Sequence, residues 1–368
     1  MRRWLQPAIP AENIEDQYAY KNTGSTTAAL VHFVHRVTKM LEQNAYVRCL
    51  MIDFSKAFDS VDHVILMSKL TQLNLPSYVV NWICSFLAGR GQQCKVNGKL
   101  SMVACIGRSI VQGSGIGPTL YIVMKSDLHA LSKLNDLFKY ADDTTLLVPE
   151  HTDTTCNISV EFSHVKAWAS TNHLTLNLLK TKEIVFKRPR VRCFHLPHAI
   201  DDIEQLDCNT LLGVLFQSNF KMDLHVQNIL SQCTQRMYLI KLLKHQGMPQ
   251  QQLSVITYSI IVSRMLYALP AWGGFISAEF KNRINAFLSA LGDLAISIVL
   301  LTLMISLTIL IMICLKKFAP QLTPFIICFR RVAQVTCVCV VILSSCLSIL
   351  LICIKNRTLF DLCMNISN

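Results

Sequence analysis

An abrupt change of composition near residue 290 constrains this chain more than any other feature of its sequence. Two long runs, residues 294–315 and 332–354, contain no charged side chain, whereas charged residues are spread throughout the part before them. At the rise of an α-helix, about 1.5 Å per residue, either run can cross a hydrocarbon layer of about 30 Å. The sequence therefore predicts a folded part up to residue 290 and an apolar tail, residues 291–368, with two transmembrane helices.

The bulk composition limits partners and compartment. The chain has 368 residues and a formal charge of +12, which favours a polyanionic partner, either nucleic acid or an anionic membrane face. Eight of the 15 cysteines precede residue 291 without a C-x-x-C pair, which indicates free thiols in a reducing compartment. The opening residues, MRRWLQPAIPAEN, are too polar for a signal peptide, so we expect a protein that is not secreted.

Hydrophobic periodicity up to residue 134 predicts alternating helices and strands. Apolar residues three and four apart predict a helix over 17–45, and an apolar run predicts a buried strand over 47–52 that ends on Asp53. A second helix begins at Pro76-Ser77, and its expected apolar side is Val80, Ile83, Cys84 and Leu87. Residues 93–106 are typical of a hairpin turning at Asn97-Gly98, and Pro118 opens a helix that we expect to reach about residue 134.

The pattern continues with a second hairpin, residues 137–140 and 144–148, whose bend is Ala141-Asp142-Asp143. We expect a helix over 157–170, strands over 173–178 and 183–187, and then mostly helix to residue 290. Interleaved helices and hairpins indicate the α+β class. The two apolar helices of the tail would follow this fold.

Three carboxylates lie where strands end. Asp53 closes the first buried strand, and Asp142 and Asp143 occupy the bend of the second hairpin. If these elements are neighbours in one sheet, the three like charges raise one another's pKa unless a cation neutralises them. Hard oxygen ligands suit Mg²⁺, and two such ions would assist an in-line displacement at phosphorus. The alternative is ordinary turn chemistry, since Asp-Asp is common at bends.

Several segments together resemble the palm motifs of reverse transcriptases carried by non-LTR (LINE, jockey-like) retrotransposons. MIDFSKAFDSVDH (51–63) resembles the first motif of that family, IVQGSGIGPTLY (110–121) the second and FKYADD (138–143) the third. LNLLKTKEIVF (176–186) is similar to the next motif, and CNTLLGVLF (208–216) to the strand that grips the primer. The stretch around QLSVITYSIIVSRMLYALPAWG (252–273) is similar to the thumb of the family.

The resemblance implies an RNA-directed DNA polymerase with a right-hand fold. It implies a residual fingers segment over residues 1–45, a palm over 46–217 and a helical thumb over 218–290. The expected partners are an RNA template, a DNA primer and deoxynucleoside triphosphates, and we expect no stable protein partner. The expected cofactor is a pair of Mg²⁺ ions, or Mn²⁺, held by Asp53, Asp142 and Asp143.

The same resemblance assigns further site residues. Lys180 matches a lysine proposed to protonate pyrophosphate, although on its residues alone a solvated surface lysine is equally expected. Phe58 matches the aromatic ring beneath the incoming sugar, where it would collide with a 2′-hydroxyl; its alternative is a core phenylalanine. The other candidates for nucleotide or template binding are Phe54, Gln112, Gly113, Ser114 and Tyr140, although Gln112 to Ser114 could be an ordinary glycine loop.

Some features depart from the family or stay open. The earlier finger segments are missing or reduced to sixteen residues, which puts turnover in doubt and leaves a catalytically inactive remnant as the alternative function. Val111 replaces the proline usual before the Gln-Gly pair, and Ser126 stands where the family has Asn. The basic run 187–192 could follow a nucleic-acid backbone or form a solvated loop.

The tail admits two interpretations. The basic loop between its apolar runs, with Lys316, Lys317, Arg330 and Arg331, would lie in the cytosol by the positive-inside tendency. A two-span hairpin would then place the polymerase part on the opposite side, away from template and triphosphates. Either the charge bias is overridden and the tail anchors the protein to a membrane, or the tail is a frame-shifted continuation. We favour the second. Without a genuine tail we expect the cytoplasm or nucleus.

Overall fold

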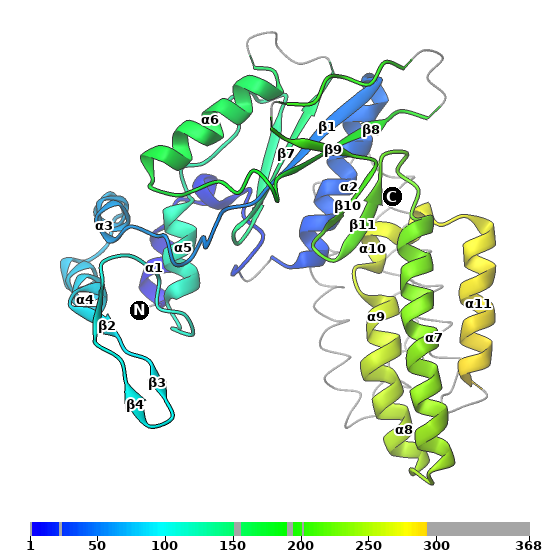
Figure 1. The fold of residues 1–368 in the computed structure, drawn as a ribbon. Helices are drawn as coiled ribbons and strands as arrows, with labels where there is room; N and C mark the ends of the chain where they lie inside the picture. Colours follow the sequence, from blue (N-terminus) through cyan, green and yellow to red (C-terminus); the bar gives the residue numbers. More distant parts are fainter. Residues whose placement is uncertain (1, 22–23, 151–155, 190–193, 201, 293–368) are drawn as a thin grey trace, which may run out of the picture. The chain divides into compact units, whose positions relative to one another are not determined.

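The computed structural model describes residues 2–21, 24–150, 156–189, 194–200 and 202–292 (Figure 1). All of them belong to one compact unit, residues 1–313, and the second unit, residues 314–368, lies outside the described residues. Both expected transmembrane helices, 294–315 and 332–354, therefore fall outside the described part. The basic run 187–192 is described only as far as residue 189.

A five-stranded sheet forms the centre of the described unit, in the order β6-β7-β1-β8-β9. Strand β1 (Tyr46–Ile52) is central and pairs antiparallel with β7 (Asp143–Pro149) and β8 (Lys182–Lys187). Strand β6 (Asp136–Tyr140) pairs antiparallel with β7, whereas β9 (Glu204–Leu206) pairs parallel with β8. The strand predicted over 47–52 and the hairpin around 141–143 are confirmed.

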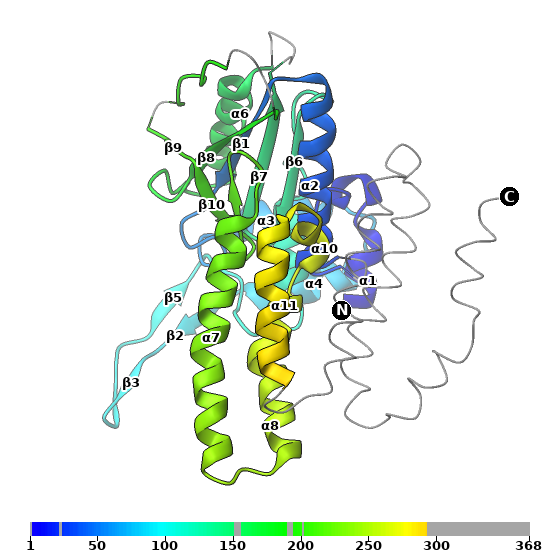
Figure 2. The same cartoon turned by 90° about the vertical axis from the view of Figure 1, so that its right-hand side faces the viewer.

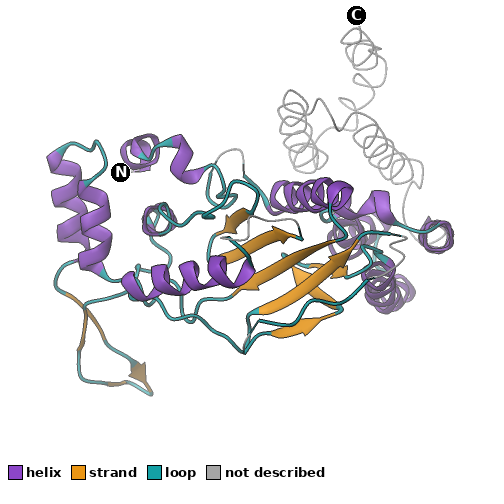
Figure 3. Ribbon diagram, turned by 90° about the horizontal axis from the view of Figure 1, so that it is seen from above, coloured by secondary structure: helices purple, strands orange, loops and turns teal. Residues whose placement is uncertain are grey.

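The sheet separates two hydrophobic cores because successive side chains of β1 point to opposite faces. Val47, Cys49 and Met51 belong to one core, and Leu50 and Ile52 belong to the other. Helix α2 (Thr26–Gln43) covers the first face, where the ring of Phe33 packs against three further phenylalanines, Phe138, Phe186 and Phe216. Helix α6 (Ile158–Thr171) contributes to the second core, and Figure 3 shows helices on both sides of the sheet.

Both covering helices begin at residues suited to cap them. The side chain of Ser25 accepts a hydrogen bond from the backbone of Ala28 at the start of α2, at 3.0 Å. Asn157 accepts from Ser159 and Val160 at the start of α6. The helix predicted over 17–45 thus begins only at residue 26, because Gln17 and Tyr18 pair with Lys139 of β6 instead. The helix predicted over 157–170 is confirmed.

An arm of two helices and a hairpin extends from the second core (Figure 1). It comprises α3 (His63–Thr71), α4 (Ser77–Leu87), β2 (Arg90–Gln92) paired with β5 (Ala104–Ile106), and β3 (Lys95–Val96) paired with β4 (Lys99–Leu100). The turn at Asn97-Gly98 has positive φ at both residues, which confirms the predicted hairpin turn. The expected apolar face of α4 was partly wrong: Val79, Ile83 and Leu87 are buried, whereas Cys84 is exposed.

Two further local predictions were wrong. Helix α5 (Gly117–Met124) ends ten residues before residue 134, because the chain beyond it is held by long-range polar contacts: the carboxylate of Glu161 accepts the backbone N–H groups of Leu131 and Ser132. Residues 173–178 form a loop rather than a strand, joined to the residue after Asp53 by a single bridge between Phe54 and Leu176.

The C-terminal part of the described unit is helical after a small hairpin. Strands β10 (Cys208–Leu211) and β11 (Val214–Gln217) interrupt the expected helical region, and they fall in the segment CNTLLGVLF that was predicted to contain a strand. Helix α7 (Asp223–His245) packs against α11 (Ala278–Gly292), which Figure 2 shows alongside it, and against α8 (Gln250–Thr257). A short π-helix (Tyr258–Val262), α9 (Ser263–Leu266) and α10 (Leu269–Trp272) follow α8 in this region.

One helical stretch of the described residues, Gln250–Phe275, is long and apolar enough to cross a membrane by length and composition alone. Eight of its apolar residues are buried in the core that it shares with α7: Leu253, Ile261, Val262, Met265, Ala268, Leu269, Ala271 and Trp272. The core helix of a folded domain passes the same test, so the stretch is weak support for a membrane span.

Candidate active site

The sheet brings the three predicted carboxylates to one edge. Ile52 pairs with Thr144 across β1 and β7, so Asp53 and Asp143 are the next residues at the same end of adjacent strands. Asp142 precedes Asp143 in the bend between β6 and β7, where Tyr140 pairs with Asp143. Residues about 90 positions apart in the sequence are thus neighbours because their strands pair.

The bend that carries Asp142 is held from the N-terminal side. Ala141 adopts a left-handed conformation, with φ of 56°, which costs a non-glycine residue on the order of 1 kcal/mol. Its backbone N–H donates to Oε1 of the buried Gln17 at 3.1 Å. The segment around Gln17 runs parallel to β6, with Tyr18 donating to the carbonyl of Lys139 at 2.8 Å. The N-terminal segment around Gln17 therefore fixes the strained backbone of Ala141, just before Asp142.

Asp53 is held through its backbone by the turn that contains Lys180. Asn177 donates to the carbonyl of Asp53 at 2.9 Å, and the Asp53 N–H donates to the hydroxyl of Thr181 at 3.3 Å. The same hydroxyl donates to the carbonyl of Asn177 at 2.8 Å, which closes the turn. Lys180 is exposed within this turn, so the structure ties its backbone to Asp53 while its side chain remains in solvent.

The carboxylates influence one another electrostatically. The carboxyl group of Asp143 has its pKa raised above the ordinary value, first by loss of water around it and then by the negative charge of Asp142, with Asp53 adding to the effect. The ammonium of Lys125 acts in the opposite direction. Three negative groups thus share one strand edge, an arrangement that a bound divalent cation would stabilise.

The donor chemistry fits Mg²⁺, although the side chains do not form a closed cage. Within the described residues, no three His, Cys, Asp or Glu side chains lie close enough to hold a metal ion by themselves. Magnesium is commonly held by one or two carboxylates and completes its coordination with water and substrate phosphates. Asp53 and Asp142, with Asp143 beside them, are the residues that would hold it.

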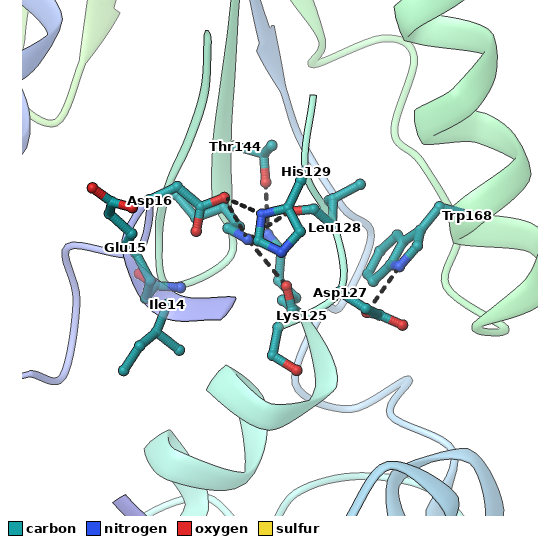
Figure 4. Close-up of polar contacts among 12 residues, drawn as sticks. Ile14, Glu15, Asp16, Lys125, Asp127, Leu128, His129, Thr144 and Trp168 are labelled. Atoms are coloured by element: carbon teal, nitrogen blue, oxygen red, sulfur yellow. Dashed lines mark hydrogen bonds and ion pairs between the residues drawn. The ribbon is translucent and has the colours of Figure 1, made fainter. Parts of the chain in front are cut away.

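A buried polar network lies beneath the bend, and sequence reasoning missed it (Figure 4). The Lys125 Nζ donates to the carbonyl of Asp142 at 2.9 Å and to the hydroxyl of Thr144 at 2.6 Å. Burial, followed by the positive charge of Lys139, lowers the pKa of Lys125 to about 7. The signal in the sequence was weak, because Lys125 directly follows the apolar run from Leu120 to Met124 and is itself followed by the polar Ser126 and Asp127.

The second buried lysine of this network connects it to the N-terminal segment. Lys139 Nζ donates to the carbonyls of Leu128 and Lys125, at 2.6 and 3.1 Å, and pairs with the Asp16 carboxylate at 2.9 Å. Asp16 also accepts from His129 at 3.0 Å. Figure 4 shows Asp16 and His129 converging on the end of α5 from different segments. The loop after α5, β6 and the N-terminal segment are therefore held together by one set of buried bonds.

The aromatic candidates occupy two different environments. Phe58 is half-buried and stacks on Tyr121, with ring centroids 4.2 Å apart and an interplanar angle of 22°. Tyr121 is fully buried, and burial, followed by the charges of Asp142 and Asp143, raises the pKa of its hydroxyl. Phe54 is 4% exposed and packs edge-on against Trp168 with Lys125 Nζ 4.7 Å from its ring centre. Its ring therefore supports the site from the core.

Tyr140 and the glycine loop lie at the rim of the site. Burial, followed by the neighbouring Tyr267, raises the pKa of the half-buried Tyr140. Gln112 donates to the Asp59 carboxylate at 3.0 Å, one residue after Phe58, and so joins the loop to the segment that follows Asp53. Gly113 has φ of 80° and open space where a side chain would be. Its backbone can thus be approached closely, as predicted for a loop that lines a ligand.

The turn that leads into α5 leaves no space for a side chain at Gly117. The hydroxyl of Ser114 accepts the backbone N–H of Gly117 at 3.0 Å. A Cβ on Gly117 would lie 2.8 Å from that hydroxyl and 2.9 Å from Cγ2 of Ile110, closer than packed atoms tolerate. Ser114 thus shapes the turn, and whether it also contacts nucleotide or template stays a prediction.

A model of the family described as "Reverse transcriptase (RNA-dependent DNA polymerase)" matches residues 2–260 of the chain. The chain belongs to this family. The resemblance stated from its motifs is thereby confirmed, and the five-stranded sheet with its covering helices and the helical C-terminal region are the palm and thumb of a right-hand α+β fold.

Relatives of this reverse transcriptase include two proteins of Drosophila melanogaster mobile elements. The "Probable RNA-directed DNA polymerase from transposon BS" is 25% identical over 291 residues, covering 74% of this chain and 31% of the relative. The RNA-directed DNA polymerase from mobile element jockey is 24% identical over 274 residues, covering 70% and 29%. The chain thus spans about 30% of the length of these relatives. They agree with the predicted non-LTR retrotransposon type.

Among solved structures, a telomerase of Candida tropicalis in complex with a fragment of telomeric RNA matches this reverse transcriptase with a TM-score of 0.46. The sequence identity is 11%, and the match covers 88% of this chain and 56% of the telomerase chain. The assignment of the fold rests on the observed sheet order and packing.

Proposed function

We propose that this chain catalyses RNA-directed DNA synthesis, adding deoxynucleotides to the 3′-hydroxyl of a primer. In this proposal residues 46–217 act as the palm, residues 218–290 as the thumb, and residues 1–45 as the remainder of the fingers. The single observation that carries the proposal is the meeting of Asp53 with Asp142 and Asp143 at one end of β1 and β7. Membership of the reverse transcriptase family supports the reaction type.

The proposed metal ligands are Asp53 and Asp142, with Asp143 as the third acid. A bound pair of Mg²⁺ ions would supply charge stabilisation at the attacking and leaving oxygens. The chain itself fixes the positions of the two aspartates. The backbone of Asp53 is hydrogen-bonded to the 177–181 turn, and the carbonyl of Asp142 accepts from the Lys125 ammonium. Carboxylates fixed through their backbones need little reorganisation when the substrate binds.

Other residues would recognise the nucleotide and transfer a proton. The exposed Lys180 would donate a proton toward the departing pyrophosphate, since its turn is tied to Asp53. The stack of Phe58 on Tyr121 would hold the Phe58 ring where a ribonucleotide 2′-hydroxyl would collide with it. The open backbone at Gly113 would approach template or triphosphate.

Primer extension on poly(rA)/oligo(dT) by the full chain tests the proposal. The expected result is extension that requires Mg²⁺ and disappears in Asp142→Asn, a substitution that keeps the shape of the side chain and removes its charge. Asp202→Asn is a matched control because Asp202 is an exposed carboxylate in the loop before β9. A wild-type protein that binds the primed template but shows no Mg²⁺-dependent extension would contradict the proposal.

A catalytically silent nucleic-acid-binding protein is the second candidate. The observation that favours it is the open arrangement of the carboxylates, because no closed cage of three ligands exists within the described residues. The two candidates differ in one measurement. Template binding that is unaffected by Mg²⁺, together with absent extension, supports the silent form.

A further inference from the structure

An exposed aromatic column runs along α4 and onto the hairpin of the arm. Tyr78, Trp82, Phe86 and Arg90 follow one another at intervals of four residues, and residues so spaced share one side of a helix. Tyr78 and Trp82 are 58% and 44% exposed, whereas the opposite side of α4 buries its aliphatic residues in the second core. Large rings therefore face solvent on a helix that already has a buried apolar side.

The rings are ordered into a stack that is open at one end. The rings of Trp82 and Phe86 are nearly parallel, with an interplanar angle of 6° and centroids 5.3 Å apart. The Arg90 guanidinium lies 4.5 Å from the centre of the Phe86 ring, and its Nε donates to the Phe86 carbonyl at 2.7 Å. A guanidinium, a phenyl ring and an indole thus form a continuous series, and the partly exposed indole offers the next stacking position.

The chain segment that forms the arm carries only positive charge. No Asp or Glu occurs from residue 63 to residue 126, whereas six Lys or Arg do. Three of these, Arg90, Lys95 and Lys99, are exposed on the hairpin that continues from α4, which Figure 1 shows projecting from the arm. This segment therefore offers stacking rings and cations, and contributes no acid of its own.

We infer that the Tyr78–Trp82–Phe86–Arg90 column and the Lys95–Lys99 hairpin tip form a binding surface for single-stranded nucleic acid, with a base stacked on Trp82 and phosphates at the two lysines. Single strands are the polyanions whose unpaired bases stack on aromatic side chains, whereas a duplex hides its base faces. The biological role of this surface, binding template for the polymerase, rests on the proposed function. The binding itself can be measured without catalysis.

Fluorescence anisotropy of labelled single strands, oligo(rU) and oligo(dT) of roughly 20 nucleotides, measures the binding by the full chain without divalent metal. Trp82→Ala is expected to weaken binding by roughly five-fold or more, while Trp82→Phe, which keeps a stacking ring, stays close to wild type. Tyr238→Ala, which removes an exposed ring on α7, is the control for a general loss of aromatic surface.

Two further readouts separate stacking from charge. Because Trp4 is also exposed and packs against Tyr78, the quenching is measured with Trp4→Phe in every protein. Bound bases should quench the remaining tryptophan fluorescence, and adding Trp82→Phe should remove most of that quenching while binding persists. The Lys95→Ala/Lys99→Ala variant should reduce the slope of log Kd against log salt by about 1.4, because each phosphate contact on a single strand contributes about 0.7. Lys166→Ala, on exposed α6 surface, should leave the slope unchanged.

Several outcomes would overturn the inference. Trp82→Ala with wild-type affinity, or quenching that persists in Trp82→Phe, would remove the stacking role. A change in sedimentation behaviour on Trp82→Ala without a change in affinity would identify the column as a contact between copies of the chain. If Trp82→Ala fails to fold, the quenching measurement on Trp82→Phe still decides. If the protein shows no primer extension but still binds single strands through Trp82, the proposed polymerase function is contradicted and the inference about the binding surface is not.

Discussion

A buried histidine between palm and thumb should make the fold sensitive to mild acid. His225, in the first turn of α7, is 6% exposed, and its Nδ1 accepts the backbone N–H of Leu215 in β11 at 3.3 Å. Its ring meets Trp272 of α10 edge-on, with centroids 5.1 Å apart. Burial, followed by the positive charge of Arg264, lowers the pKa of His225 to about 4. The folded state therefore favours the neutral form of the His225 ring.

The magnitude follows from proton linkage. Because an unfolded histidine has a pKa of about 6.5, the unfolded chain binds more protons at this position between about pH 6.5 and pH 4. Stability must therefore fall as pH decreases through this window. Between pH 7 and pH 5, a shift from about 6.5 to about 4 corresponds to a loss of about 2 kcal/mol in the free energy of unfolding.

Urea unfolding at pH 7 and pH 5, followed by tryptophan fluorescence, measures this loss. His225→Asn is the matched variant, because its amide oxygen can replace Nδ1 as acceptor for Leu215 and cannot be protonated in this range. Any cost of losing the contact with Trp272 applies at both pH values and cancels in the difference. The wild type should lose about 2 kcal/mol more than the variant. Equal pH dependence in the two proteins, to within about 0.5 kcal/mol, would refute the reasoning.

Three further perturbations test the site and the tail. Phe58→Ala should lower the preference for deoxynucleotides over ribonucleotides by roughly ten-fold or more in kcat/KM, because the ring stacked on Tyr121 is removed. Unchanged selectivity would show that Phe58 does not discriminate between the two sugars. Lys125→Met should lower kcat by about ten-fold with little change in KM for the triphosphate, because the carbonyl of Asp142 and the hydroxyl of Thr144 lose their donor; wild-type kcat would make Lys125 dispensable. Full-length protein should resist carbonate extraction from membranes only if residues 291–368 insert, and comparison with a chain stopped after residue 290 measures this; extraction of both supports the frame-shift interpretation.

Local sequence signals predicted those elements whose contacts are also local. The 93–106 hairpin followed from Asn97-Gly98, whose backbone conformation few other residue pairs adopt. Strand β1 and the β6–β7 hairpin followed from their apolar runs and the bend between them. The length of α5 could not be predicted in the same way, because Glu161 and Lys139, far along the chain, hold the segment after Met124.

The same distinction applies to the candidate site. The convergence of Asp53 with Asp142 and Asp143 could be predicted because each carboxylate stands at the end of a recognisable strand. The burial of Phe54 and the presence of Lys125 beneath the bend could not, because both depend on which helices cover that face of the sheet. A lysine at the end of an apolar helix is visible in the sequence, yet it does not reveal the carbonyls to which the lysine donates.

Among the residues that the structure describes, the bonds that place the carboxylates of this site are made to their backbones. The 177–181 turn bonds the amide and carbonyl of Asp53, Gln17 bonds the amide of Ala141, and Lys125 bonds the carbonyl of Asp142. Acid-to-amide substitutions leave every one of these bonds in place, so they should change the charge of the strand edge without changing its geometry. It follows that a loss of extension in Asp142→Asn reports on the charge of the carboxylate, whereas a loss in Lys125→Met reports on the position of the bend together with the positive charge beside Asp143.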